Sequence, residues 1–126
     1  MSAARTGVLA RAVWGGSMLL APRLTLRILR GGVDDRAVTI LRLLGTRHLL
    51  QATVTAWCPT RPVYVAGAAA DALHALSAVA LAVTDRRQRT PALAETALAA
   101  AWIVVAVRAW SGRGRPMSAP DRPGPF

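Results

Sequence analysis

The chain has 126 residues, of which 53% are hydrophobic, and a formal net charge of +10. This length allows one small domain and excludes a two-domain enzyme. The hydrophobic content excludes a disordered basic tail, and the single cysteine excludes a disulfide scaffold. The chain is therefore either a membrane protein or a basic soluble protein, and the positions of the apolar residues decide between the two.

The first apolar stretch, residues 8–21, is short and is interrupted by Arg11. It predicts a short membrane helix that either ends at residue 21 or continues to residue 28. A cleaved signal peptide is an alternative, but no small-x-small cleavage site precedes the end of the stretch. The segment 22–30 then predicts an interfacial helix or a basic extension of the first helix, because its arginines are spaced by four and three residues. These arginines are Arg23, Arg27 and Arg30.

Three later stretches reach the roughly 20 predominantly apolar residues that a bilayer span needs. They are residues 37–57, 63–84 and 91–110. The first of them contains Arg42 and Arg47, and a mid-bilayer arginine costs about 2.5 to 3.5 kcal/mol, so this stretch inserts marginally on its own. Opposite charges on neighbouring helices would neutralise it. We predict an all-α protein, a small transmembrane helical bundle with three full spans and a short fourth.

The charges inside these stretches match in depth. If the three spans form consecutive antiparallel hairpins, a rise of about 1.5 Å per residue puts Arg47 and Asp71 within about 3 Å of the same level. Arg42 and Glu95 each lie shortly after the start of a helix, and both helices start on the same membrane face. Because charges inside a membrane generally have partners, we predict the ion pairs Arg47–Asp71 and Arg42–Glu95.

Aromatic residues support the same arrangement. Trp57, Tyr64 and Trp110 lie at span ends on one face of the predicted bundle, where Trp and Tyr are expected at a bilayer–water interface. The opposite face receives most of the loop arginines. The positive-inside rule therefore places the turn 85–90 in the cytoplasm and the C-terminus outside.

Composition divides the chain into two parts. Residues 1–110 form the predicted membrane domain. Residues 111–126 are rich in Gly, Pro and Arg and predict a flexible basic tail. We expect a multi-pass protein of the cytoplasmic membrane.

Polar residues inside the predicted bundle are the candidates for chemistry. His48 and Gln51 share a face with Arg47, and Asp71 and His74 share a face of the next helix. These faces either act as interhelical glue or form a proton or ion site. A third alternative is a haem with His48 and His74 as axial ligands. Enzyme chemistry and a lipid-binding cleft are the remaining alternatives.

Two resemblances bear on these alternatives. Residues 45–49, GTRHL, resemble part of a motif in cytochrome b subunits of succinate dehydrogenase, which implies a haem site. That motif expects an upstream histidine, the haem ligand, where this chain has Leu41, and an aspartate where it has Ala52. The runs RLLGTRHLLQA at 42–52 and DALHALS at 71–77 resemble small integral membrane proteins of three or four helices from GC-rich bacteria. This second resemblance implies membrane location and a helical bundle, and offers no catalytic residues.

Other functions lack a matching pattern in the sequence. There is no glycine-rich phosphate loop and no second cysteine for a metal or redox site, and the arginines are spread over both predicted faces rather than gathered as in a nucleic-acid interface. We expect a noncatalytic accessory or scaffold subunit without a cofactor, packed against lipids, other membrane proteins or copies of itself. The alternative is a proton-, ion- or haem-handling protein that uses His48, Asp71 and His74. Small residues suited to close helix packing are Gly67, Ala68, Ala69, Ala70, Ala99, Ala100 and Ala101.

Overall fold

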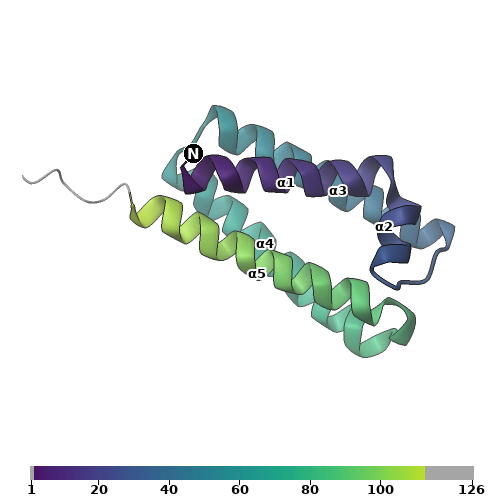
Figure 1. Cartoon of the computed structure of the whole chain (residues 1–126). Helices are drawn as coiled ribbons and strands as arrows, with labels where there is room; N and C mark the ends of the chain where they lie inside the picture. The colour runs from purple at the N-terminus through teal and green to yellow at the C-terminus, as the bar shows by residue number, and fades with distance from the viewer. Residues whose placement is uncertain (1, 113–126) are drawn as a thin grey trace, which may run out of the picture.

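A computed structural model describes residues 2–112, and every regular element in this part of the chain is a helix (Figure 1). The all-α prediction is confirmed for these residues, while most of the predicted tail, residues 113–126, lies outside them. In chain order the elements are α1 (Ala3–Leu20), α2 (Pro22–Ile28), α3 (Asp35–Trp57), α4 (Arg61–Thr84), the short 3-10 helix η1 (Arg86–Gln88) and α5 (Arg89–Ser111).

Local sequence determines where several helices begin and end. The side chain of Ser2 accepts the N–H of Arg5 at the start of α1, and the side chain of Asp34 accepts the N–H of Ala37 at the start of α3. Pro22 lies in the first turn of α2, where its missing N–H is not needed. Because this proline cannot continue α1, the first helix ends at Leu20 and the residues that follow form a separate short helix.

The long helices pack as two pairs, α1 with α3 and α4 with α5 (Figure 1). A turn of three residues, 58–60, joins α3 to α4, yet these two helices contact each other little. The prediction of consecutive hairpins is therefore wrong for α3, whose main neighbour is α1. Two hairpin-like pairs lie against each other, and α2 closes one end (Figure 1).

Two glycines explain why α1 packs against α3. A Cβ atom on Gly15 would lie 2.8 Å from the backbone oxygen of Gly45, and a Cβ on Gly45 would lie 2.6 Å from the backbone oxygen of Gly15. A side chain on either residue would clash, so only glycine allows the two backbones to approach this closely. The buried face of α3 runs through this contact, with residues spaced alternately by three and four. They are Val38, Leu41, Gly45, His48 and Ala52.

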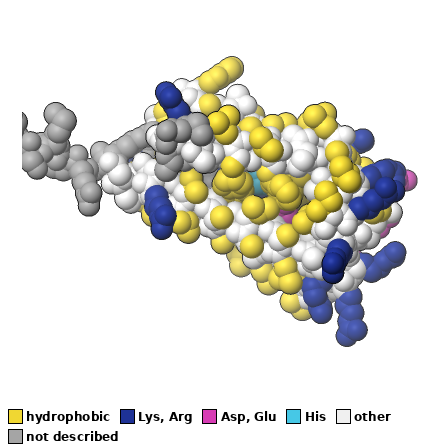
Figure 2. All heavy atoms as spheres, in the orientation of Figure 1, with side chains coloured by type: hydrophobic (Ala, Val, Ile, Leu, Met, Phe, Trp, Pro, Cys, Tyr) yellow, Lys and Arg dark blue, Asp and Glu magenta, His cyan; other side chains and the backbone are white. Residues whose placement is uncertain are grey.

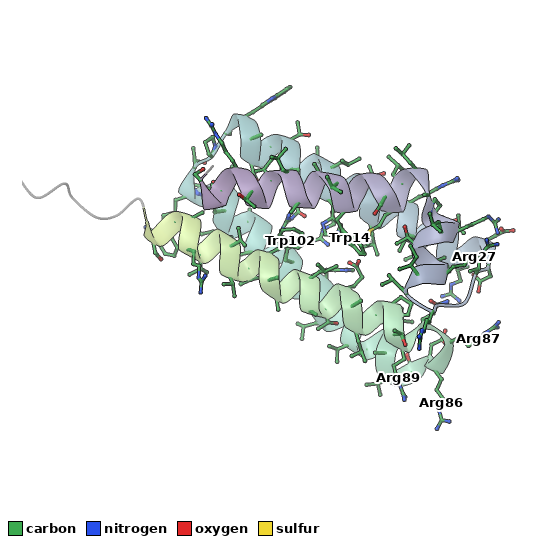
Figure 3. The ribbon with its side chains drawn as sticks, in the orientation of Figure 1. Trp14, Arg27, Arg86, Arg87, Arg89 and Trp102 are labelled. Atoms are coloured by element: carbon green, nitrogen blue, oxygen red, sulfur yellow. The ribbon has the colours of Figure 1, made fainter. Side chains whose placement is uncertain are left out.

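The two ends of the bundle differ in charge. Gly32 donates its N–H to the backbone oxygen of Arg87 at 3.3 Å, which fixes the loop after α2 against η1. We call this end the arginine end. Figures 2 and 3 show most of the basic side chains there. The turn 58–60 and the end of α5 lie at the opposite end, and this is where Trp57, Tyr64 and Trp110 are found. The arginines in the segments that form the arginine end are Arg23, Arg27, Arg30, Arg36, Arg86, Arg87 and Arg89.

Many large apolar side chains are exposed while several ionisable side chains are buried, which differs from a water-soluble fold. Large hydrophobic side chains are exposed along the helices, and Figure 2 shows them across the visible face. Leu20 is 85% exposed and Val83 is 73% exposed, whereas His48 and Asp71 are each 1% exposed. Soluble proteins rarely bury ionisable groups beneath such an exterior.

Two helical segments are long and apolar enough to cross a membrane, Arg61–Thr84 and Arg86–Ser111. The sequence predicts three full spans, and helix length together with hydropathy supports the last two of them. The 23 residues of α3 extend over about 34 Å, which is sufficient length. Its charged residues, among them Arg42 and Arg47, lower its hydropathy.

Candidate functional site

The first polar cluster surrounds Asp71 in the middle of α4. Arg47 of α3 donates to its Oδ1 at 2.9 Å, so the predicted ion pair forms. Arg11 of α1 donates to its Oδ2 at 2.5 Å and to Gln51 Oε1 at 2.7 Å. Gln51 in turn donates to the backbone oxygen of Gly67 at 3.4 Å. We call Arg11, Arg47, Gln51 and Asp71 the Asp71 cluster.

Arg11 is a member of this cluster that the sequence-based pairing missed. The guanidinium also lies 4.9 Å from the ring centroid of Trp102 on α5, an attractive cation–π distance. The sequence does contain a signal for this contact. Arg11 is a lone arginine within the apolar stretch 8–21, and like Arg47 it needs a partner of opposite charge inside a membrane. The predicted ion pairs join only the three later stretches, so they do not include Arg11.

The second cluster surrounds Glu95 on α5. Trp14 of α1 donates its indole N–H to Glu95 Oε1 at 3.0 Å, and His74 Nε2 lies 3.1 Å from Glu95 Oε2. His48 Nε2 lies 3.7 Å from the same Oε2. We call Trp14, His48, His74 and Glu95 the Glu95 cluster. Figure 3 shows Trp14 and Trp102 in the region between the two helix pairs.

The predicted Arg42–Glu95 pair does not form. Arg42 is exposed, and Glu95 instead has Trp14 and the two histidines as partners. The physical reason is rotation about the helix axis. Leu41 lies on the buried face of α3, and one residue further along a helix is turned by about 100°. Matching depth therefore did not bring Arg42 to the carboxylate.

His48 is the least satisfied polar side chain of the two clusters. It is 1% exposed, and neither ring nitrogen has a hydrogen-bond partner among the described residues. The distance of 3.7 Å to Glu95 is too long for a direct hydrogen bond. Buried polar groups are usually bonded to protein or water, so an unpartnered imidazole beside a carboxylate is a candidate for proton or water binding.

The arrangement of the two histidines does not suit a haem. Their ring centroids are 6.5 Å apart with an interplanar angle of 88°, and the carboxylate of Glu95 lies against Nε2 of both rings. Axial imidazoles have to present a ring nitrogen to the iron from opposite sides, so the bond between His74 and Glu95 would have to break. Among the described residues no group of three or more His, Cys, Asp and Glu side chains is arranged to hold a metal ion.

Two cavities reach the clusters from opposite ends of the bundle. The first, of about 330 Å³, lies between the helix pairs away from the arginine end and includes Arg11, Gln51, Asp71 and Trp102 in its lining. The second, of about 350 Å³, opens toward the arginine end and includes His74 and Glu95. The residues between them form a polar layer across the middle of the bundle.

The polar layer is close to neutral as a whole but uneven in charge. Arg11 and Arg47 have one aspartate between them, so the Asp71 cluster has an excess of one positive charge. Glu95 balances this charge if both histidines are neutral. It lies seven residues from Trp102 along α5, about 10 Å away. Of the charged residues in the two clusters, Arg11 and Asp71, which are bonded to each other, line the first cavity, and Glu95 lines the second.

Comparison with known proteins adds no assignment: no family model, no curated protein and no solved structure matches the chain.

Proposed function

We propose that the chain is a multi-pass protein of the cytoplasmic membrane in which α1, α3, α4 and α5 cross the bilayer, and that it is a noncatalytic accessory or scaffold subunit. The observation that supports this most is the apolar exterior around a buried, ion-paired interior. Such an exterior is favourable in lipid, and charges inside a membrane are tolerated when they pair with one another.

The polar layer fits a structural role in this proposal. The two helix pairs contact each other far less than the helices within each pair do, and the interior clusters connect them. Arg11 and Arg47 on the α1–α3 pair bond Asp71 on the α4–α5 pair. Trp14 on the α1–α3 pair likewise donates a hydrogen bond to Glu95 on the α4–α5 pair. Lipid gives no hydrophobic drive for helices to associate, so polar contacts of this kind hold membrane helices together.

The outer face of α5 supports a role in binding other membrane helices. Exposed residues on this face repeat at spacings of four and three, and three of them are alanines that allow close approach of a second helix. Ala97 and Ala101 lie one turn apart, as in membrane helix pairs that meet through small residues. The exposed face contains Leu93, Ala97, Ala100, Ala101, Val104 and Val107.

Two measurements test the proposal. The chain should stay in the membrane fraction after alkaline carbonate washing, and release by this wash would contradict the membrane assignment. Purification in mild detergent should then give a complex with a stoichiometric partner or a second copy. Ala101→Leu on α5 should dissociate that complex, whereas Ala72→Leu, at an exposed position of α4, should not. A chain that remains monomeric without any partner would contradict the subunit role.

A second candidate function, proton binding, is favoured by the unpartnered His48 beside Glu95. The second cavity reaches His74 and Glu95 from the arginine end, which would provide access for water. In this proposal Glu95 takes the acidic role that the sequence suggested for Asp71, because Asp71 is bonded to two arginines and lies in the other cluster. The arginines of the Asp71 cluster lie further along the path and oppose passage of a cation through the whole bundle.

Proton uptake by the detergent-solubilised protein separates the two candidates. On a small drop in pH, the full chain should bind more protons than His48→Gln if the Glu95 cluster is a proton site, because this change removes the unpartnered imidazole and leaves Glu95 and His74 in place. Equal uptake by both chains would refute this candidate. His74→Ala should leave assembly intact, whereas Asp71→Ala should prevent folding if the polar layer is structural.

A further inference from the structure

We propose that the arginine end binds the phosphate group of an anionic phospholipid, and that Arg30 and Arg87 are its main contacts. The proposal rests on the proposed membrane location and names one class of lipid as the partner of this end. Three features support it: the backbone of Arg30, the position of Arg87 against the loop after α2, and an excess of positive charge beside exposed apolar residues.

The backbone of Arg30 has a left-handed conformation that suits glycine. Its φ is 56°, and no other non-glycine residue in the described part of the chain has a positive φ. Arg30 donates its N–H to the backbone oxygen of Arg27 at 3.1 Å, and Gly31 donates its N–H to that of Leu26 at 2.9 Å. These two bonds form the common motif at helix C-termini in which glycine usually takes the left-handed position. An arginine there is strained, and strained residues cluster at ligand-binding and other functional sites.

Arg87 lies against the same loop. Gly32 donates its N–H to the backbone oxygen of Arg87 at 3.3 Å, and Gln88 donates a side-chain N–H to the backbone oxygen of Gly32, also at 3.3 Å. A Cβ atom on Gly32 would lie 3.7 Å from Nε of Arg87, so the Arg87 side chain lies beside this glycine. Arg30 is only two residues before Gly32. Two arginines from distant parts of the chain are therefore held at one loop.

The arginine end has more positive charge than its carboxylates neutralise. Segments 22–36 and 85–89 contain seven arginines and three aspartates, an excess of four positive charges. Two of the aspartates accept backbone N–H groups at helix starts, and the third pairs with Arg23. Neither Arg30 nor Arg87 forms an ion pair with a described residue. Figures 2 and 3 show the basic side chains gathered at this end. Since guanidinium groups bind phosphate oxygens through paired N–H donors, this surface favours a phosphate.

The exposed face of α2 offers apolar contacts that a lipid can use and a free phosphate cannot. This helix runs across the end of the bundle, crosswise to α1 (Figure 1). Leu24 and Ile28 are one turn apart and are 57% and 70% exposed. Arg23 and Arg27 lie about 100° away around the helix, on its other exposed flank. A helix with one apolar and one basic flank suits the level of lipid headgroups, where apolar side chains reach acyl chains and arginines reach phosphates.

Other partners with phosphate groups fit this end less well. Inorganic phosphate and nucleic acid make no use of Leu24 and Ile28, and segments 22–36 and 85–89 contain no aromatic residue on which a base could stack. Phosphatidylcholine has a cationic group beside its phosphate, so the excess positive charge attracts it less. An anionic phospholipid uses both the arginines and the apolar side chains.

Binding of tritiated phosphatidylglycerol to the full chain in detergent, measured by scintillation proximity, tests the proposal. Unlabelled phosphatidylglycerol should displace the label, and phosphatidylcholine with the same acyl chains should compete about tenfold or more weakly, since each arginine near an anionic headgroup adds roughly fivefold in affinity. Inorganic phosphate in excess should not displace the label. Equal competition by the two lipids, or displacement by inorganic phosphate, would overturn the proposal.

Arg30→Gly separates binding by this side chain from its effect on the fold. The change removes the charge and relieves the backbone, so the unfolding temperature should rise while phosphatidylglycerol affinity falls about fivefold. A weaker but more stable variant cannot owe its loss of binding to a damaged fold. Arg87→Gln should cause a similar fall in affinity and keep the loop in place, because Gly32 bonds the backbone of residue 87. Unchanged affinity in both variants would refute the proposal.

Arg61 provides a matched control at the opposite end of the bundle. It is exposed, and Arg61→Gln removes the same charge as the two test variants. This change should alter phosphatidylglycerol affinity by less than about twofold, because the charge lies far beyond a Debye length of about 10 Å from the arginine end. A loss equal to that of Arg30→Gly would show that only net charge matters and would overturn the assignment of the site.

Failure of this proposal is distinct from failure of the membrane assignment. Release of the chain by the carbonate wash would contradict the membrane location itself. A chain that stays in the membrane fraction but has no preference for phosphatidylglycerol would refute the lipid site alone.

Discussion

The contact between α1 and α3 predicts opposite effects for the same substitution at two neighbouring glycines. A Cβ atom on Gly15 would lie 2.8 Å from the backbone oxygen of Gly45 and 2.9 Å from Cβ of His48. A Cβ on Gly16 would have no atom of a neighbouring element within 4 Å. We expect Gly15→Ala to destabilise the bundle and Gly16→Ala to leave it intact or strengthen it.

The magnitudes follow from these distances. An ordinary van der Waals contact begins near 3.4 Å, so the helices would have to separate by about half an ångström to accept Gly15→Ala, and overpacking of this kind costs about 1 to 3 kcal/mol. The atom met on α3 is backbone, which cannot rotate out of the way as a side chain can. At Gly16 the substitution only removes the conformational freedom of glycine, which stabilises a helix by about 0.5 to 1 kcal/mol.

Thermal unfolding followed by circular dichroism in the same detergent measures both effects. Gly15→Ala should lower the unfolding temperature by several degrees relative to the unaltered chain, and Gly16→Ala should not lower it. If both variants unfold at the same temperature, the close approach of Gly15 and Gly45 is not what pairs these helices, and the two-pair arrangement loses its explanation.

Three further predictions concern the interior and the topology. Asp71→Asn leaves two guanidinium groups without a carboxylate and should reduce the free energy of unfolding by about 3 to 5 kcal/mol in a denaturant titration, whereas Asp35→Asn, at a side chain that is 95% exposed, should have no measurable effect. Glu95→Ala removes the acceptor for buried donors and should reduce the free energy of unfolding by about 2 kcal/mol or more. Arg42→Ala should change the free energy of unfolding by less than about 0.5 kcal/mol, because Arg42 is exposed. Equal losses in the two variants would indicate that Arg42 and Glu95 do form an ion pair. Cys58 is exposed in the turn opposite the arginine end, so a membrane-impermeant maleimide should label it on intact cells, and labelling only after lysis would reverse the proposed orientation.

The sequence alone determined the helices and the levels of their charges. Apolar stretches, caps and prolines depend on nearby residues, and the rise per residue fixes how far along a helix each side chain lies. For this reason Arg47 and Asp71 could be matched across a short turn, and the observed 2.9 Å contact agrees. The gathering of Trp57, Tyr64 and Trp110 at one end follows from the same arithmetic.

Only the tertiary structure decided which helices are neighbours and how each is rotated. Two side chains at the same depth make contact only if they also lie on facing sides of their helices. Arg42 lies on the exposed side of α3 and does not reach Glu95, whereas His74 lies on the side of α4 that does. The rotation of α3 depends on the backbone contact between Gly15 and Gly45, two residues 30 positions apart whose role appears only when α1 and α3 are side by side. That contact brings the α1 face with Arg11 and Trp14 into the interior, and so it fixes both polar clusters.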